Sequence, residues 1–312
     1  MNNFTLIIPT HNRHQYLKRS MEYFKDLEAE VIYCDSSIEK YIGDLKNNIK
    51  YLHFPEKSFA EKINLVLSNI KTKYVALCAD DDFIIIESLY KGFEFLKKNK
   101  EFNTVVGKYI AFNEKFNGEY YKRYTSMPDD VCSNASNNAE YFFKNYYQIL
   151  WAMYDKEILI KAFIIINEAS FKNDNFIEMV IGSCACYKGG IKILDEIWGV
   201  RELSAQDHWG MRHIPLNDIV NINQDNDCKM FKKLINEKTF EGYSDLVLNS
   251  YLKGRVLKNN TLKKMIPKSI KLLIKKVINL LFSKKKHSLI LSSNEEKNMS
   301  RLSLILKSNC IE

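Results

Sequence analysis

The chain has 312 residues and a formal net charge of +8, and 46% of its residues are hydrophobic. A charged fraction of 27% with 12% aromatic residues excludes a disordered polymer, and 11 Gly with 5 Pro exclude a collagen-like or loop-dominated chain. The length allows one large domain or two smaller ones. The seven cysteines include no C-x-x-C pair, which favours reduced thiols in a cytosolic protein. We expect neither a signal peptide nor a transmembrane helix.

The first 110 residues alternate between two hydrophobic periods. Short apolar runs predict five buried strands, at residues 4–8, 31–34, 49–54, 74–78 and 104–106. Apolar residues at helical spacing predict three helices between them, over residues 17–24, 59–70 and 89–96. This alternation predicts an α/β fold with a mainly parallel central sheet and right-handed crossovers.

The rest of the chain is less regular. Residues 111–172 are rich in Tyr and Asn and give no clear period, whereas 174–186 predict a helix and 191–194 a strand. From about residue 222 onward the pattern indicates helices and linkers. We therefore expect one α/β domain over residues 1–220 and a C-terminal helical region over residues 221–312.

Polar residues follow three of the predicted strands, namely Thr10-His11-Asn12-Arg13, Asp35-Ser36-Ser37 and Asp80-Asp81-Asp82. In sheets of this kind, ligands bind beyond the carboxyl ends of the strands. We therefore expect these three segments to meet at one edge of the sheet and to form the functional site.

The acidic triplet carries the strongest chemical signal in the chain. Three consecutive carboxylates at the end of a buried strand repel one another unless a positive charge compensates them. A divalent cation with oxygen ligands, Mg²⁺ or Mn²⁺, would do so; the alternative is a solvated acidic turn at the start of the next helix. The chain lacks both G-x-G-x-x-G and G-x-x-x-x-G-K-[ST], so a glycine-rich phosphate loop is disfavoured.

These segments carry a resemblance to a known family. The run Leu6-Ile7-Ile8-Pro9-Thr10-His11-Asn12-Arg13, with Leu17 after it, resembles the opening of family 2 glycosyltransferases of the GT-A fold. Cys78-Ala79-Asp80-Asp81-Asp82-Phe83 resembles the D-x-D region of that family, and Lys57 to Asn64 is similar to its third segment. The resemblance is clear over residues 4–110, weaker over 140–205 and absent after that.

The resemblance implies a Rossmann-like nucleotide-diphospho-sugar domain and an inverting sugar transfer from a nucleotide-sugar, most often a UDP-sugar. It implies a set of donor-binding residues, namely Pro9, Thr10, Asn12, Arg13, Asp35, Lys57, Asn64, Asp80, Asp81 and Arg201. Asp35 would contact the nucleotide base, although the family more commonly has a pair of acids there. Arg201 would either bind the diphosphate or form a structural salt bridge.

The same resemblance implies a Mn²⁺ or Mg²⁺ cofactor bound to the acidic triplet. The family pattern fits Asp80 and Asp82 as ligands, and a variant pattern would use Asp80 and Asp81. His208 is a candidate third ligand, although a single histidine is more often an ordinary surface or core residue. The metal would neutralise the departing diphosphate as a Lewis acid.

An inverting transfer needs a carboxylate base on the acceptor side. Asp174 and Glu178 are the candidates, and their spacing of four places both on one face of a helix. We prefer Glu178, because its apolar neighbours indicate the partly buried setting that raises a carboxyl pKa. Either residue is otherwise an ordinary exposed carboxylate of a helix.

The basic charge is concentrated near the C-terminus. Residues 252–286 contain twelve Lys or Arg and no acid, and about 262–286 predict an amphipathic helix with one apolar and one lysine-rich face. Such a helix is typical of an anionic membrane surface; the alternative is a core helix with solvated lysines. The segment lacks the interleaved aromatic residues of a nucleic-acid site, so we expect no nucleic acid as a partner.

The sequence therefore predicts a peripheral enzyme at the inner face of the cell membrane. It would transfer a sugar to a glycan or lipid-linked acceptor in cell-surface polysaccharide biosynthesis. Two alternatives remain open. A nucleotidyltransferase of related fold would carry a glycine-rich N-terminal loop, which Thr10–Arg13 is not. A non-catalytic membrane-associated protein would bind vesicles but no nucleotide.

Overall fold

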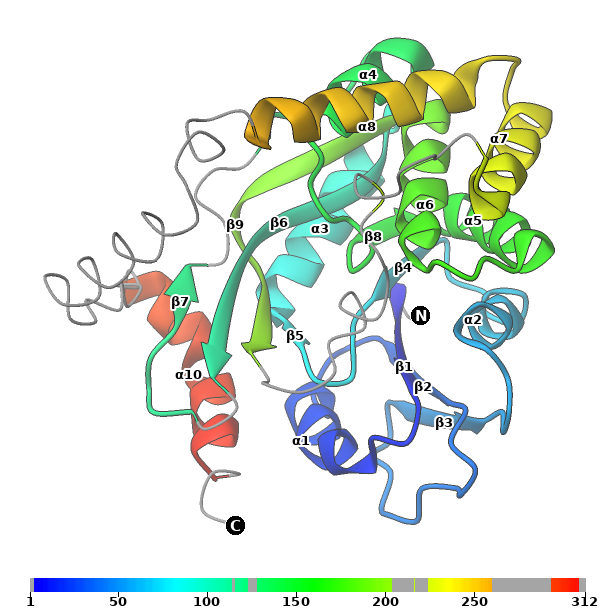
Figure 1. Ribbon diagram of the computed structural model, residues 1–312. Coiled ribbons are helices and arrows are strands. Elements are labelled where there is room, and N and C mark those ends of the chain that lie inside the picture. The colour runs from blue at the N-terminus through cyan, green and yellow to red at the C-terminus, as the bar shows by residue number, and fades with distance from the viewer. Residues whose placement is uncertain are drawn as a thin grey trace, which may run out of the picture.

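The computed structural model describes residues 3–113, 116–122, 128–203, 216, 224–259 and 293–308. The strands of these residues form one mixed sheet in the order β3-β2-β1-β4-β8-β6-β9-β5, with β7 paired to β6 (Figure 1). Among the described residues, no helix combines the length and apolar character that a membrane span requires.

The first half of the sheet is parallel, as the sequence predicts. It consists of β1 (Phe4–Thr10), β2 (Glu30–Asp35), β3 (Ile49–His53) and β4 (Tyr74–Leu77). The connecting helices are α1 (His14–Phe24) and α2 (Phe59–Leu67), and α3 (Ile86–Lys98) follows β4. Every residue of β1 is buried, which is typical of a strand covered on both faces.

The second half of the sheet is mixed. It contains β5 (Phe83–Ile84), β6 (Phe102–Asn113), β7 (Tyr121–Lys122), β8 (Met153–Asp155) and β9 (Gly190–Leu203). The short β8 lies antiparallel between β4 and β6, while β6 and β9 run parallel. The sequence predicted only short parts of β6 and β9. Their pairing shifts register around Lys108, and such irregularities interrupt the apolar pattern of a strand.

Within the described residues, six further helices pack against the sheet or against other helices. They are α4 (Ala135–Lys144), α5 (Lys156–Ala169), α6 (Asn175–Lys188), α7 (Asn226–Lys238), α8 (Tyr243–Asn259) and α10 (Ser293–Ser308). Helix α8 runs along α4 at the top of Figure 1, and α10 contacts α1. The expected C-terminal helices are thus present, while the boundary near residue 220 remains a prediction.

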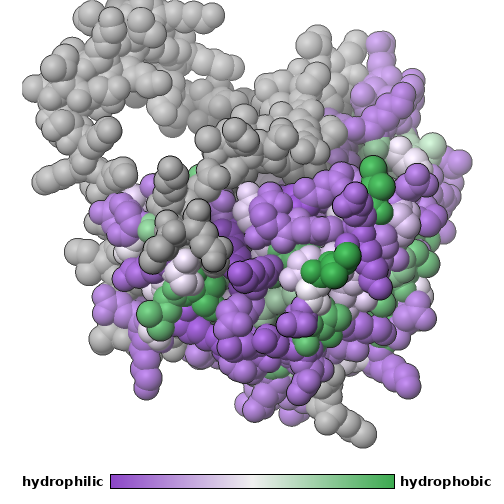
Figure 2. All heavy atoms as spheres, turned by 90° about the horizontal axis from the view of Figure 1, so that it is seen from below, coloured by the Kyte–Doolittle hydropathy of each residue, from purple (hydrophilic) through white to green (hydrophobic). Residues whose placement is uncertain are grey.

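The strand ends meet where the sequence predicts. Thr10 and Asp35 are partners in the β1–β2 register, and Ile7 of β1 pairs with Leu77 at the end of β4. The carboxyl ends of β1, β6 and β9 point downward in Figure 1. Seen from below, the surface of the molecule is mainly hydrophilic, with separate hydrophobic patches (Figure 2).

Candidate active site

Asp80 lies at the junction of β4 and the loop after β1. Its carboxylate is 3% exposed and accepts a hydrogen bond of 2.7 Å from Thr10 Oγ1. Arg13 Nη1 lies 3.3 Å from the other oxygen of Asp80, and Arg13 Nη2 donates to Asp81. The last residue of β1 and the loop after it therefore hold two of the three acids, through one hydroxyl and one guanidinium group.

The third acid, Asp82, is held from β9. Its Oδ1 accepts from the backbone N–H of Glu202 at 3.1 Å, and Arg201 Nε lies 3.6 Å from its Oδ2. Arg19 of α1 joins the two sides, because it pairs with the Glu202 carboxylate and donates to the Asp81 carbonyl. The acids are thus clamped by arginines from α1, the loop before it and β9.

These arginines do not fully compensate the acids. Burial raises the pKa of Asp80, and repulsion from Asp81 adds to the rise against the opposing charge of Arg13. Burial and Asp81 likewise raise the pKa of Asp82 against Arg201. Further positive charge would therefore stabilise the ionised site, and carboxylate oxygens are the donors that Mg²⁺ and Mn²⁺ prefer.

The carboxylates of the acidic triplet fit such a metal as a site that substrate and water complete. No three His, Cys, Asp or Glu side chains are arranged to enclose an ion in the part of the chain that the structure describes. Mg²⁺, however, is commonly bound by one or two carboxylates together with substrate phosphates and water. Asp80 and Asp82, each held by an arginine at more than 3 Å, are suited to that kind of site.

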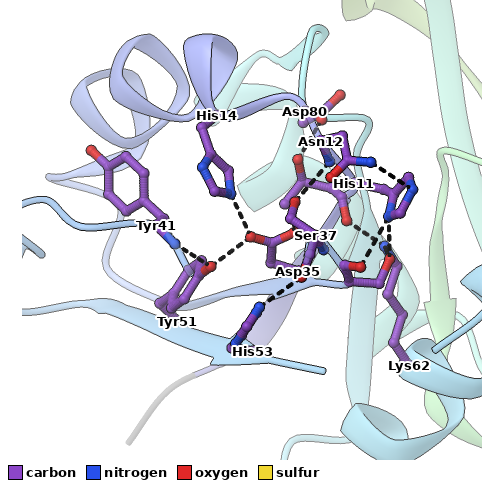
Figure 3. Close-up of polar contacts among 12 residues, drawn as sticks. His11, Asn12, His14, Asp35, Ser37, Tyr41, Tyr51, His53, Lys62 and Asp80 are labelled. Atoms are coloured by element: carbon purple, nitrogen blue, oxygen red, sulfur yellow. Dashed lines mark hydrogen bonds and ion pairs between the residues drawn. The ribbon is translucent and has the colours of Figure 1, made fainter. Parts of the chain in front are cut away.

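Asp35 lies at the end of β2 and is completely buried. One oxygen accepts from the backbone N–H and the hydroxyl of Ser37, at 2.8 and 2.5 Å. The other lies 2.8 Å from His14 Nε2 and accepts from the Tyr51 hydroxyl at 2.5 Å (Figure 3). Burial alone would raise the pKa of Asp35, but these hydrogen bonds outweigh it and hold the pKa below its usual value.

The hydrogen bonds that Asp35 already makes affect its predicted contact with a nucleotide base. A carboxylate has about four lone-pair positions, and four donors already occupy those of Asp35. Its side chain therefore orders the loop around Ser37 and fixes the His14 ring. Direct contact of Asp35 with a nucleotide base remains a prediction and would require one of these donors to leave.

Lys62 is a site residue that the sequence analysis missed. Its ammonium group is buried, although the residue lies on the helix α2 (Figure 3). It donates to the Thr10 carbonyl at 2.5 Å and to Ser36 Oγ at 3.0 Å, so it joins the ends of β1 and β2. Burial lowers its pKa. The available signal was the place of Lys62 beside Ile63 and Val66 on the apolar stripe of this helix.

The other residues predicted to bind the nucleotide-sugar donor lie in two settings. Pro9 is buried within β1, and Asn12 has a left-handed φ of 54° with its N–H donating to Ser37 Oγ at 2.7 Å. Lys57 is exposed and lies 3.0 Å from Glu61 at the start of α2, and Asn64 is half-buried on the same helix. Pro9 and Asn12 thus adjoin the strand ends, whereas Lys57 forms a surface ion pair.

A cavity of about 410 Å³ opens beside Asp35 and its hydrogen-bond partners His14 and Ser37. It is lined by Asn12, His14, Gln15, Ser37, Ile38 and Glu39. His11 precedes Asn12 in the chain, and its Nδ1 atom lies 3.0 Å from the carbonyl oxygen of Ser36. The ends of β1 and β2 therefore present polar groups on both sides of Asn12.

The two predicted base candidates differ in their contacts. Glu178 accepts from the Gln148 amide at 2.6 Å and from the Tyr146 hydroxyl, so donors engage both of its oxygens. Gln148 Oε1 in turn accepts from Arg201 at 2.5 Å. Asp174 precedes the first turn of α6, is half-buried and makes no capping hydrogen bond with its side chain. Both carboxylates thus belong to the amino-terminal end of α6.

Two predictions lie outside the described residues. They are His208 as a metal ligand and the amphipathic helix at about 262–286.

The sequence matches the family described as glycosyl transferase family 2 over residues 5–174, and no curated protein matches the chain. The chain therefore belongs to glycosyl transferase family 2 and is a glycosyltransferase, as the strand-end motifs predicted. The GT-A fold is also confirmed by likeness to a solved structure. S. aureus TarS 1–349 in complex with UDP-GlcNAc is 16% identical with a TM-score of 0.57, over 87% of this chain and 78% of that one. The same TarS fragment in complex with UDP is 15% identical with a TM-score of 0.49, over 84% and 93%.

Proposed function

We propose that this glycosyltransferase takes its sugar from a UDP-sugar and transfers it, with inversion, to a glycan or lipid-linked acceptor in cell-surface polysaccharide biosynthesis. The observation that carries the proposal is the convergence of Asp80, Asp81 and Asp82 with the ends of β1 and β2 at one sheet edge. Acids for a metal-bound diphosphate and a polar region for the nucleoside are thereby adjacent. One similar solved structure, S. aureus TarS 1–349, is in complex with UDP-GlcNAc, which makes a UDP-sugar the first donor to test.

Asp80 and Asp82 are the residues that would hold Mn²⁺ or Mg²⁺. A bound divalent cation supplies Lewis-acid stabilisation of a leaving diphosphate. Arg13 is 35% exposed at its side chain, so it is the arginine free to move from the acids toward a phosphate group. Arg201 is buried, which favours its role as a structural partner of Asp82.

We propose Asp174 as the general base, in place of the preferred candidate of the sequence analysis. The acceptor hydroxyl oxygen would attack the anomeric carbon while the bond from that carbon to the diphosphate oxygen breaks. The Asp174 carboxylate would take the hydroxyl proton. The contacts of Glu178 with Tyr146 and Gln148 support this choice, because they give Glu178 a different role.

The test is release of UDP from UDP-GlcNAc with Mn²⁺, with and without candidate acceptors. We expect Asp82→Asn to lower turnover at least 100-fold, and Asp174→Asn to lower transfer to a similar degree while UDP still binds. Asp44→Asn, in an exposed loop, is the matched control. Wild-type activity in both site variants would contradict the proposed roles.

Membrane association belongs to the same proposal and rests on the charge of residues 252–286. We expect binding to vesicles of phosphatidylcholine with phosphatidylglycerol, but not to phosphatidylcholine alone. Replacing Lys268, Lys271 and Lys275 by Gln should weaken binding roughly 100-fold at about 1 kcal/mol per charge. The same replacement of Lys91, Lys97 and Lys98, exposed on α3, is the control. Equal binding by both triple variants would contradict the assignment.

A further inference from the structure

A chain of polar groups connects helix α6 to the acidic triplet. It runs from Tyr146 to Glu178, then through the Gln148 side-chain amide to Arg201 and on to Asp82. Its members come from the loop after α4, from α6, from β9 and from the segment after β4. The chain therefore spans the distance between the helix that carries the proposed base and the acids that carry the proposed metal.

Chemistry alone determines the direction of each hydrogen bond in this chain. The Glu178 carboxylate only accepts, and the Arg201 guanidinium only donates. The Gln148 amide must therefore turn its NH₂ to Glu178 and its oxygen to Arg201, which agrees with the observed contacts of 2.6 and 2.5 Å. Glu178 thus fixes the orientation of Gln148, and this orientation gives Arg201 its acceptor.

The position of Arg201 matters for the acids. Its guanidinium carbon lies 4.3 Å from the centre of the buried Tyr109 ring, and its Nε lies 3.6 Å from Asp82 Oδ2. The contact with the ring face restricts the position of the guanidinium, while the hydrogen bond to Gln148 restricts its rotation. Loss of this acceptor would let Arg201 turn away from Asp82.

We propose that Glu178 and Gln148 are positioning residues, which hold Arg201 against Asp82 and thereby set the geometry of the donor site. This inference rests on the proposed function, because the geometry it protects is that of the diphosphate site. In this role, the Glu178 carboxylate is held in place by hydrogen bonds and does not take the proton from the acceptor.

An exchange of the two side chains tests the proposal. In Glu178→Gln, Gln148 keeps its orientation only if the new amide turns its oxygen to Gln148 and its NH₂ to Tyr146, whose hydroxyl must then accept instead of donate. In Gln148→Glu, two carboxylates face each other. In the double variant, Gln at 178 accepts from Tyr146 and donates to Glu at 148, which accepts from Arg201. Every hydrogen bond of the chain is then restored.

We expect Gln148→Glu to lower kcat of UDP release by roughly tenfold or more and Glu178→Gln to lower it less, with KM for an acceptor little changed. The double variant should return to within about threefold of wild type, and Glu140→Gln on the exposed face of α4 serves as control. A double variant that stays inactive would overturn the proposal in favour of Glu178 as base. A Gln148→Glu variant with wild-type kcat would overturn it as well.

Unfolding by denaturant distinguishes failure of this inference from failure of the proposed function. A wild-type protein without turnover of any nucleotide-sugar contradicts the proposed function. In that case the inference still predicts that both single variants are destabilised and that the double variant recovers most of the loss. Additive losses in the double variant would overturn the polarised chain independently of activity.

Discussion

At the scale of single residues, the site is organised by side chains that satisfy one another across strand ends. Asp35 receives four donors, and Lys62 donates to both β1 and the segment after β2. Buried charges of this kind destabilise a protein unless they are paired, so each contact also fixes the geometry of the edge. The first function of Asp35 and Lys62 is therefore to shape the place where a donor would bind.

Asp35 makes the stability of the fold depend on pH in a defined direction. Its pKa is below the usual 3.8 in the folded chain, so it contributes stability above pH 3.8 that is lost as the pH falls through the folded-state pKa. We expect Asp35→Asn to lower the free energy of unfolding by about 2 kcal/mol at pH 7. Denaturant titrations at pH 7 and pH 3 should show the difference from wild type shrinking in acid. A difference of equal size at both values would refute the assignment, and Asp44→Asn provides the baseline.

Two lysines of the α2 region offer a matched comparison. Lys62 is buried with two acceptors, whereas Lys57 is exposed beside Glu61. We expect Lys62→Met to destabilise the chain by about 1–3 kcal/mol, since it removes a buried charged donor from Ser36 Oγ and from the Thr10 carbonyl, which keeps only the Ser36 N–H at 3.2 Å. Lys57→Met should change the stability by less than about 0.5 kcal/mol. Thermal unfolding of both variants checks this, and equal melting temperatures would speak against a structural role for Lys62.

The sequence predicted the residues that follow strands and missed those that reach the site from elsewhere. Asp35 and the acidic triplet were found because a strand pattern ends directly before them. Arg19, Lys62 and Gln148 were missed, since their roles depend on contacts with residues 26 to 183 positions away. Such contacts follow from the packing of elements, which a local pattern does not contain.

At the scale of elements, the strands and helices before residue 100 were predicted closely, except for the two-residue strand β5, because each has a clear period and a stop at Pro, Asp or a polar cluster. The long strands β6 and β9 were not, because their pairing is irregular around Lys108. The segment between them holds α4, β8 and α5, in a region whose composition gave no period. These elements are stabilised by tertiary contacts that outweigh local preference.

The close packing of α8 on α4 depends on one glycine. A Cβ atom at Gly254 would lie 2.0 Å from the Lys144 carbonyl oxygen, so any side chain there forces the two helices apart. We expect Gly254→Ala to cost about 1–3 kcal/mol in the free energy of unfolding, although Ala favours a helix. Lys253→Ala, exposed on the same helix, is the control. A stabilised Gly254→Ala variant would show that α8 does not pack in this way.

At the scale of the whole molecule, charge and chemistry are assigned to different parts of the chain. Residues 252–286 have a net charge of +12, and the whole chain has a net charge of +8. The other residues together therefore have a net charge of −4. The net basic charge of the chain therefore comes from one segment, which we propose binds a membrane surface, and the rest of the chain is mildly acidic. In the proposed function, the parallel half of the sheet would supply the donor side of the site, and β9 with α6 would supply the acceptor side.

The central claim is that the strand-end acids bind a nucleoside diphosphate together with a divalent cation. Calorimetric titration of the full chain with UDP, with and without Mn²⁺, tests this most directly. The account predicts that Mn²⁺ strengthens UDP binding by roughly tenfold or more in the wild type, and that Asp82→Asn abolishes this gain. UDP binding that is absent, or equally strong with and without Mn²⁺, would contradict it.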